Sequence, residues 1–459
     1  MPNYIPGTAT TLSGMNATAL RRIVWEKKLR EDSVRPSVFN HIMTEYKITD
    51  NQIDIVKPGM MLDVTNVGRN NGQSVRLALS TPLRKRPKYG PDNLMLGNED
   101  ESDLLWTELY YNEIKKAIKF KNWGYDFNDT AYLNWVESYG PKLTNFMAEN
   151  YDTRCQEALL LTYAEELSAT PVSKGQQFNK NWFIPNLDES NFPAWDLTAL
   201  TRTDGAADSD EYLSSRTYSG AATFVENIAA ALLSASGTGS TSNAVLNVDN
   251  LAYLSTWIFD QHVVDPVDID GIPTVCLKIP LRVHGWLKNP NNAGSIAAYW
   301  QNVADYIDKD RMKIPGEIGR IFDNIIVAVD PRCPTLTVAG SVGSYTLQPG
   351  FMQPGNNDDR NANAWANTSG ATNYVFDMCT VMGSNCLAKF THDPLVTNLA
   401  ESTEYGQIQG RGAYLGEGLQ IPAFDKDAGG QADGASTTQI QRGSCLVPMS
   451  RRAIASITS

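Results

Sequence analysis

One stretch of the sequence limits the possible folds more than any other, because it is long and contains neither glycine nor proline. Positions 142–168 follow Pro141, a residue that suits a first helical turn. Leu143, Met147 and Arg154 mark a stripe of mixed polarity with helical spacing along it. A helix through this stretch would run roughly 40 Å, well beyond the average helix. The sequence therefore predicts a rod-like element along which other parts of the chain are arranged.

The preceding residues, 51–122, alternate between apolar and polar side chains. Leu62 and Val64 alternate first, and a second alternating run at 75–79 follows Asn71 and Gly72, which suit the positive φ angles of a tight turn. These features predict two strands joined as a hairpin, and the imperfect alternation through 107–123 predicts a further strand. The segment has few bulky residues, so we expect a long excursion that has no core of its own and must lie on another surface.

A cluster of cations lies inside this excursion, next to a cluster of acids. We call the cations the basic finger: Arg84, Lys85, Arg86 and Lys88. Glu99, Asp100 and Glu101 follow shortly after them. The residues alone leave two interpretations open, a solvated loop or a surface that contacts a partner.

The charge of the whole chain limits its partners. With 39 Lys and Arg against 51 Asp and Glu, the net charge is −12 and the pI about 4.9. Such a chain repels nucleic acid as a whole, so any DNA contact must be local and carried by clustered cations. One such cluster lies on a short amphipathic helix expected near the N-terminus: Arg21, Arg22, Lys27, Lys28 and Arg30. This balance argues against a DNA-reading enzyme.

The beginning of the chain shows no basic segment followed by an apolar run, and no eighteen apolar residues occur together anywhere. We therefore expect a protein that is neither secreted by that route nor membrane-spanning. The six cysteines are scattered, which fits free thiols in a reducing compartment.

The remaining elements mix helices and strands. Residues 169–246 are loop-like, with one expected helix at 221–235. Helices are expected at 247–263 and 295–307, a strand running into a helix at 271–290, and a strand at 321–331. After a Gly- and Asn-rich stretch at 339–373, strands dominate the C-terminal part. The glycines of 410–416 lie among these strands and predict a twisted or bulged strand.

The sequence carries no recognisable catalytic or metal-binding motif. The four histidines share no metal-ligand spacing, and the sequence contains neither a nucleophile elbow nor a phosphate-binding loop. Asp265, Asp268 and Asp270 before Gly271 suggest a calcium loop, but that alignment puts Leu277 where the bidentate acid belongs. We interpret this segment as a solvated turn and expect no catalytic residue, no metal and no cofactor.

The order of these elements resembles the major capsid proteins of tailed bacteriophages, which have the Hong Kong 97 fold, and most of all a podophage-type branch of that family. The resemblance rests on a Leu-x-Gly-Asn-Glu element leading into an alternating strand (94–120) and a helix with Asp152 near its middle. A strand-Pro-helix unit (275–287), the strand 321–331 and a Tyr-Gly start to a long strand (404–416) follow in the family's order. Residues 170–246 and 335–373 depart from the pattern as insertions, and the N-terminal arm looks too short for a fused scaffolding domain.

The resemblance implies an α+β capsid fold with a spine helix and a specific division of the chain. The parts are an N-terminal arm (1–50), an extended loop (51–122), a peripheral domain with the spine helix (123–169 and 400–459), an insertion (170–246), and an axial domain (247–399) with a loop insertion near 335–373.

The resemblance also implies a function: a non-enzymatic subunit that self-assembles as hexamers and pentamers into an icosahedral shell around double-stranded DNA. The basic finger and the acids at 99–101 would contact a neighbouring subunit, and the N-terminal cations would face scaffold or packaged DNA. Portal, scaffolding and decoration proteins would be further partners, with assembly in the host cytoplasm and no membrane. Two alternatives remain open: a carbohydrate-active enzyme with paired carboxylates, and a phage tail or receptor-binding protein, which should show repeats or trimeric coiled segments.

Overall fold

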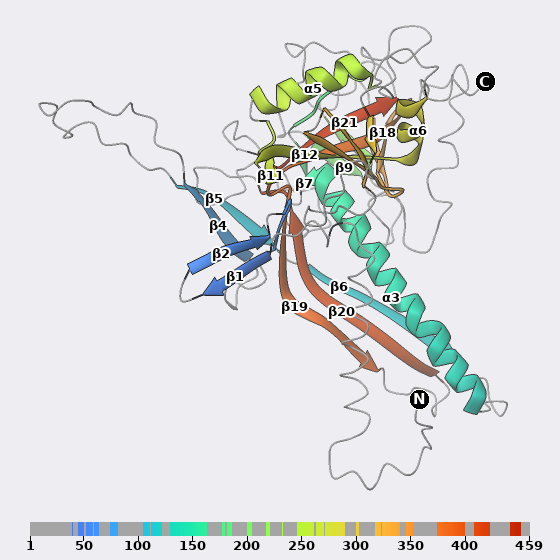
Figure 1. The fold of residues 1–459 in the computed structure, drawn as a ribbon. Helices are drawn as coiled ribbons and strands as arrows, with labels where there is room; N and C mark the ends of the chain where they lie inside the picture. Colours follow the sequence, from blue (N-terminus) through green and yellow to red (C-terminus); the bar gives the residue numbers. More distant parts are fainter. Residues whose placement is uncertain are drawn as a thin grey trace, which may run out of the picture.

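A computed structural model of the chain describes a set of segments that together carry all its named strands and helices. Described are residues 39, 45–49, 52–57, 59–63, 74–80, 104–110, 112–121, 129–162, 177–179, 181–185, 200–203, 217–220, 232, 246–260, 263–269, 271–289, 300–302, 317–322, 324–339, 346–351, 374–399, 408–422 and 441–450. These residues confirm the expected mixture of helix and sheet (Figure 1).

The rod-like element exists and is longer than expected. Helix α3 spans Asp129–Leu160, 32 residues, which corresponds to about 48 Å. It begins before Pro141, which we expected at its first turn, and it ends at Leu160 rather than near 168, where the chain enters strand β7 (Leu161–Thr162). Pro141 removes one backbone hydrogen bond from the ladder. The proline ring also crowds the carbonyl four residues earlier, at a total cost of about 3 kcal/mol. The helix nevertheless continues through Pro141, so this residue does not mark its start.

A four-stranded sheet lies along α3. Its strands follow the order β3 (Met61–Asp63), β19 (Leu387–Leu399), β20 (Ile408–Gln420) and β6 (Asn112–Lys121). The expected strand with many glycines is β20, and bulges interrupt its pairing on the β19 side. Leu143 and Met147 of α3 pack on Ala413 of β20. We call α3 and these strands the limb, because in Figure 1 α3, β6, β19 and β20 extend together away from the larger sheet described below.

The excursion at 51–122 forms strands, but the expected hairpin is wrong. Strand β3 pairs in parallel with β19, whereas β4 (Ser74–Ser80) pairs with β5 (Leu104–Tyr110), so β3 and β4 are not partners. Strands β1 (Glu45–Thr49) and β2 (Gln52–Lys57) form a separate ribbon. The alternation of apolar and polar residues identified the strands. Their pairing depends on which distant parts of the chain pack against them.

The excursion also packs on its own chain more than we expected. Leu109 of β5 is buried with Ala388 and Phe390 of β19, and Leu62 and Leu77 pack against them. Part of the excursion is therefore buried within the subunit.

An 11-stranded sheet forms the upper body. Its order is β13-β14-β15-β12-β18-β16-β17-β10-β9, with β11 also paired to β12 and β21 to β18. The bounds are β9 Leu200–Thr203, β10 Thr217–Gly220, β11 Val267–Ile269, β12 Ile272–Ile279, β13 Trp300–Asn302, β14 Glu317–Ile321, β15 Ile325–Val329, β16 Thr335–Ala339, β17 Thr346–Gly350, β18 Tyr374–Met382 and β21 Ser444–Ser450. Strand β12 pairs with β15 in parallel and with β18 antiparallel.

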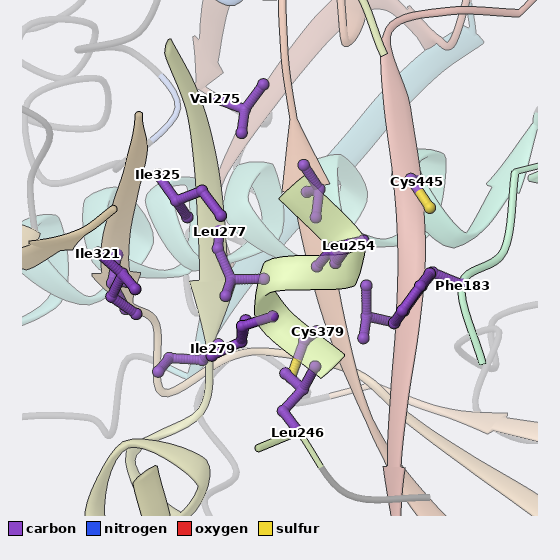
Figure 2. Packing of buried hydrophobic residues seen from close by; sticks show 14 of the residues in the cluster. Phe183, Leu246, Leu254, Val275, Leu277, Ile279, Ile321, Ile325, Cys379 and Cys445 are labelled. Carbon is purple, nitrogen blue, oxygen red and sulfur yellow. The ribbon is translucent and has the colours of Figure 1, made fainter. Parts of the chain in front are cut away.

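Two helices cover this sheet around the largest core cluster of the described residues. They are α5 (Val248–Asp260), which Asn247 caps by accepting a hydrogen bond from the Asn250 amide, and α6 (Leu281–Lys288). Leu254 of α5, Leu277 of β12 and Cys379 of β18 belong to this cluster, and Figure 2 shows side chains from the helix and the strands meeting there. The expected helix at 247–263 and the strand-helix unit at 271–290 are thereby confirmed.

Several segments outside these elements differ from expectation. Both presumed insertions contribute to the sheet, where β10 of one pairs with β17 of the other. The expected helix at 295–307 contains strand β13, which the adjacent β14 stabilises by pairing. Within the expected helix 221–235 the structure describes Leu232 alone, as helical and buried. Strand β21, from the segment assigned to the peripheral domain, pairs with β18.

Candidate functional site

Glu417 of β20 is a buried carboxylate at which the long helix meets the limb sheet. Its side chain is 2% exposed, and Oε2 accepts a hydrogen bond from Arg154 Nη1 of α3 at 2.8 Å. Arg154 Nη2 also donates to the Glu417 carbonyl at 3.0 Å, so the guanidinium makes two hydrogen bonds to β20, one to a side chain and one to the backbone. From β19, Lys389 Nζ lies 3.3 Å from Oε1. One carboxylate therefore joins a helix to two strands, and its burial is compensated by two cations.

Tyr151 adds an aromatic surface to this junction. Lys389 Nζ lies 5.0 Å from the centroid of its ring, and the Tyr151 hydroxyl donates to Met61 Sδ of β3 at 3.8 Å. Burial, with a smaller contribution from Cys155, raises the pKa of Tyr151. Burial, followed by Asp152, raises the pKa of Cys155. Both groups stay protonated at neutral pH, so the ionic contacts here are those of Arg154, Lys389 and Glu417.

Asp330 links α3 to the 11-stranded sheet, as Glu417 links it to the limb sheet. Its carboxylate accepts a hydrogen bond from Gln156 Nε2 of α3 and another from the Arg332 amide at 2.8 Å. The Arg332 guanidinium lies 3.3 Å from Glu149 Oε1 of α3 and donates to the Glu149 carbonyl. The turn after β15 is thereby joined to α3 at two points, Glu149 and Gln156, which lie about two helical turns apart.

Lys278 of β12 is a buried cation beside Asp330. Its side chain is fully buried, and Nζ lies 3.7 Å from Asp330 Oδ2. Nζ also lies 4.2 Å from the centroid of the Phe39 ring, which is itself fully buried. A charged amine out of water needs such partners, because isolated burial of a charge is costly. Phe39, which we assigned to the N-terminal arm, is thus part of the core around α3.

Arg282 and Asp377 form another ion pair in the upper body. Arg282 Nη2 of α6 lies 3.2 Å from Asp377 Oδ1 of β18, whose side chain is 2% exposed. The pair holds the first turn of α6 against the centre of the 11-stranded sheet.

An uncharged hydrogen-bond hub fixes the C-terminal end of α3. Asn179 Nδ2 donates to the Leu159 carbonyl at 3.2 Å and to Ser444 Oγ at 2.8 Å. Asn179 Oδ1 accepts from the Asn181 amide at 3.0 Å and from Gln441 Nε2 at 2.9 Å. All four hydrogen-bonding positions of this buried amide are therefore filled. Residues 179 and 181–185, expected in a loop-like insertion, join the helix end to the segment entering β21.

Replacing Asn179 with alanine should lower the free energy of unfolding by about 3 kcal/mol, because several buried polar groups lose their partner at once. Chemical denaturation of the subunit measures the loss, and hydrogen exchange at 155–162 should rise with it. Thr256→Ala, on an exposed turn of α5, should change stability by less than about 0.5 kcal/mol. Equal effects of the two substitutions would contradict a special role for the hub.

The residues predicted for intersubunit and lumen contacts lie outside the described residues. This holds for Arg84, Lys85, Arg86, Lys88, Glu99, Asp100 and Glu101, and for Arg21, Arg22, Lys27, Lys28 and Arg30. The flanks of the basic finger are described: β4 and β5 pair with Ser80 opposite Leu104, so in the sequence the finger falls within the segment that connects two paired strands. In Figure 1 this ribbon projects from the side of the molecule.

The buried charges were missed by the sequence interpretation, although two had a visible signal. Lys278 interrupts the apolar run of β12, and Asp330 closes the apolar run of β15. Because such residues are almost never fully buried unless paired, their occurrence on neighbouring strands could have suggested a pair. Glu417 stands among glycines in β20 and carries no comparable signal.

Metal and thiol chemistry find no support in the described residues. No group of three or more His, Cys, Asp or Glu side chains among them is arranged to hold a metal ion. Asp268 is exposed on β11 and Gly271 has a φ of 79° at the following turn, while Asp270 lies outside the described residues. The six cysteines are all buried and no disulfide joins them, and burial raises the pKa of Cys386 to about 12. Among the described helices, none is long and apolar enough to cross a membrane.

Comparisons with known proteins give matches among solved structures alone. No model of a protein family matches the chain, and no curated protein sequence matches it. A cyanophage Pam1 capsid structure is similar, with 13% identity, a TM-score of 0.45, and coverage of 91% of this chain and 93% of that one. For the capsid of Ralstonia phage GP4 the values are 13%, 0.43, 85% and 87%. For the head of Helicobacter pylori bacteriophage KHP40 they are 11%, 0.46, 90% and 90%. The chain is thus similar in structure, at low sequence identity, to bacteriophage capsids.

Proposed function

We propose that this chain is the major capsid subunit of a tailed bacteriophage, a structural protein that assembles with copies of itself into a closed shell. The shell encloses double-stranded DNA and is built from hexamers and pentamers. The order of sequence elements that resembles this family supports the proposal. The podophage-type branch and the domain boundaries given above stay predictions.

The observation that carries the proposal is the shape and thin packing of the limb. Along α3, the last residues Ala158, Leu159 and Leu160 are buried, whereas Asn145 on the distal part is exposed. At that distal part the buried cluster of described residues consists of Leu143, Met147 and Ala413. Among the described side chains, this distal part of α3 therefore buries little apolar surface against the narrow sheet.

The edge of the limb has the character of a surface open to neighbours. Strand β6 is the outer strand of the sheet, and Lys115, Lys116 and Ala117 on it are exposed. Edge lysines are a common protection against uncontrolled strand pairing. Such an edge allows contact through side chains while it resists open-ended strand addition, which suits a subunit that must assemble in one geometry.

The two alternative functions have no observation in their favour. A carbohydrate-active enzyme needs two carboxylates that face a cleft. The buried carboxylates of the described residues, on Glu417, Asp330 and Asp377, instead each lie against a cation inside the fold. The described elements also contain no repeated unit of the kind expected for a tail fibre.

Electron microscopy of the purified protein tests the proposal. We expect rings, tubes or shells in negative stain, and X-ray scattering should show large particles whose proportion rises with concentration. A compact monomer of this length would have a radius of gyration near about 23 Å. Scattering that gave this value at every concentration would contradict the proposed function.

We further propose that the N-terminal cations contact scaffold or packaged DNA. Arg21, Arg22, Lys27, Lys28 and Arg30 are concentrated in an otherwise acidic chain, which makes them the cations best suited to phosphate contacts. Removing residues 1–30 should reduce the number of filled particles, counted by microscopy, without loss of subunit solubility. The deletion stops before Phe39, which anchors in the core. Normal filling without these residues would show that the cations are dispensable.

A further inference from the structure

Helix α6 presents an outward face with an exposed leucine and an exposed glycine one turn apart. Leu281 is 66% exposed, the highest value among the large hydrophobic side chains of the described residues. Gly285 is also exposed, and Lys288 follows on the same side, since positions i, i+4 and i+7 share one helix face. We call Leu281, Gly285 and Lys288 the α6 face.

Nothing in the described part of the subunit requires a glycine at position 285. Glycine is among the least favourable residues inside a helix. A Cβ atom added at Gly285 would meet nothing within 4 Å, and its φ angle is not in the positive range. Neither backbone conformation nor internal packing therefore requires glycine here. A close approach by another molecule would require it, because a missing side chain lets a partner reach the helix backbone.

Helix α5 presents an outward face of complementary character. Asp249, Tyr253, Thr256 and Asp260 recur on one side of the helix, and Tyr253 is 43% exposed. We call these four residues the α5 face. The sequence of α5 contains two aspartates and no lysine or arginine, whereas that of α6 contains Arg282 and Lys288 and no acid. Asp260 is the last residue of α5, so its negative charge lies at the negative end of the helix dipole, where it is unfavourable.

The two faces lie at different places on the upper body. Both helices contribute to the same core cluster, Leu254 from α5 and Val283 from α6. In Figure 1, however, they are separate elements of the upper body, α5 toward its upper left and α6 toward its right. Two complementary surfaces at separate places on one chain produce a head-to-tail contact between copies, and such contacts generate closed rings when the rotation closes.

We propose that the α6 face of one subunit docks on the α5 face of the next subunit around a ring of identical copies. Leu281 supplies apolar contact area, and Gly285 lets the Tyr253 side of the neighbour approach closely. Lys288 faces one of the neighbour's two aspartates, which lie about 16 Å apart along α5. This inference rests on the proposed function, since it names the surfaces through which copies of the chain meet around a ring.

Charge exchange and a steric block test the docking directly. The variants are Gly285→Gln, Lys288→Glu, the pair Asp249→Lys with Asp260→Lys, and all three charge reversals in one chain. Asp268→Lys, an exposed acid on β11, serves as the matched control. Rings and shells are counted by negative stain at a fixed subunit concentration, and melting curves of unassembled subunits report on folding.

We expect the glutamine variant and each one-sided reversal to give at least about tenfold fewer particles, because like charges or a side chain replace a favourable contact. The combined reversal should restore assembly, and the control should assemble normally. Melting temperatures should stay within a few degrees of wild type, since the substituted positions are outside the core. Gly285→Ala should melt at or above wild type and still assemble less well.

The outcomes separate this inference from the function on which it rests. A wild-type protein that forms no rings or shells overturns both. Wild-type particles accompanied by equal numbers from Gly285→Gln and the one-sided reversals overturn the docking alone. Loss of assembly that the combined reversal does not restore shows that α6 meets some surface other than the α5 face, which also overturns it.

Discussion

Replacing Glu417 with alanine should destabilise the subunit by about 3 kcal/mol, because the substitution leaves two cations facing each other at a buried junction. Arg154 and Lys389 are 19% and 13% exposed, so water can reach them in part and the loss should stay at the lower end of the range for a broken buried pair. The loss affects α3, β19 and β20 together, since all three meet at this carboxylate. Denaturant titration of the subunit measures it.

Two control variants show whether the charge of Glu417 or the shape of its side chain is responsible for the lost stability. Glu417→Gln keeps the size of the side chain but removes its charge, so it should remain clearly destabilised. Replacing the whole cluster by Glu417→Leu, Arg154→Met and Lys389→Met removes every charge at once and should recover much of the stability, as replaced buried ion pairs often do. A Glu417→Ala variant that unfolds at the same denaturant concentration as wild type would show that the junction is not held by these contacts.

Reversing the basic finger should stop assembly while it leaves the subunit folded. Each exposed ion pair contributes at most about 1 kcal/mol, so changing Arg84, Lys85, Arg86 and Lys88 to glutamate should hardly move the melting curve. At an interface the same change places like charges together, which costs several kcal/mol per contact. A shell repeats that cost at every subunit. Particle counts beside melting curves for the two proteins measure the difference.

A charge-preserving variant is the matched control for the basic finger. Exchanging arginine and lysine at the four positions keeps every positive charge and should leave assembly close to wild type. High salt should weaken wild-type assembly in parallel with the glutamate variant, because screening acts on exposed charges. Normal particles from the glutamate variant would mean that the basic finger is a solvated loop. A collapsed melting temperature would place it in the subunit's own fold.

Much of the secondary structure could be predicted because it follows from local patterns. The helical spacing around Met147, the alternation through β5 and β6, and the strand-Pro-helix unit at Pro280 all lie in the expected element types. The errors occurred where a local signal competed with a tertiary one. Pro141 suggested a helix start inside α3, and residues 295–307 had helical spacing although β14 recruits Trp300–Asn302 into the sheet.

The buried contacts show why the junctions of the fold were beyond the sequence interpretation. Lys278 and Asp330 could have been suspected, since each stands out in or beside an apolar strand. Asn179 could not, because an asparagine in a polar segment reads as a turn residue until Leu159 and Ser444 are brought to it. The four hydrogen bonds to this buried amide form only after the C-terminal end of α3 and the first residue of β21 have come together.

By itself, the sequence determined that this chain has a long helix, a run of strands before it and a strand-rich end, because hydrophobic periodicity is written in neighbouring residues. Only the tertiary structure decided that β6 lies beside β20, that the two presumed insertions pair through β10 and β17, and that Glu417 holds Arg154. The two ends of that last contact are separated by 263 positions. No local pattern records such a contact, because its energy depends on the burial and charges that surround both residues after the chain has folded.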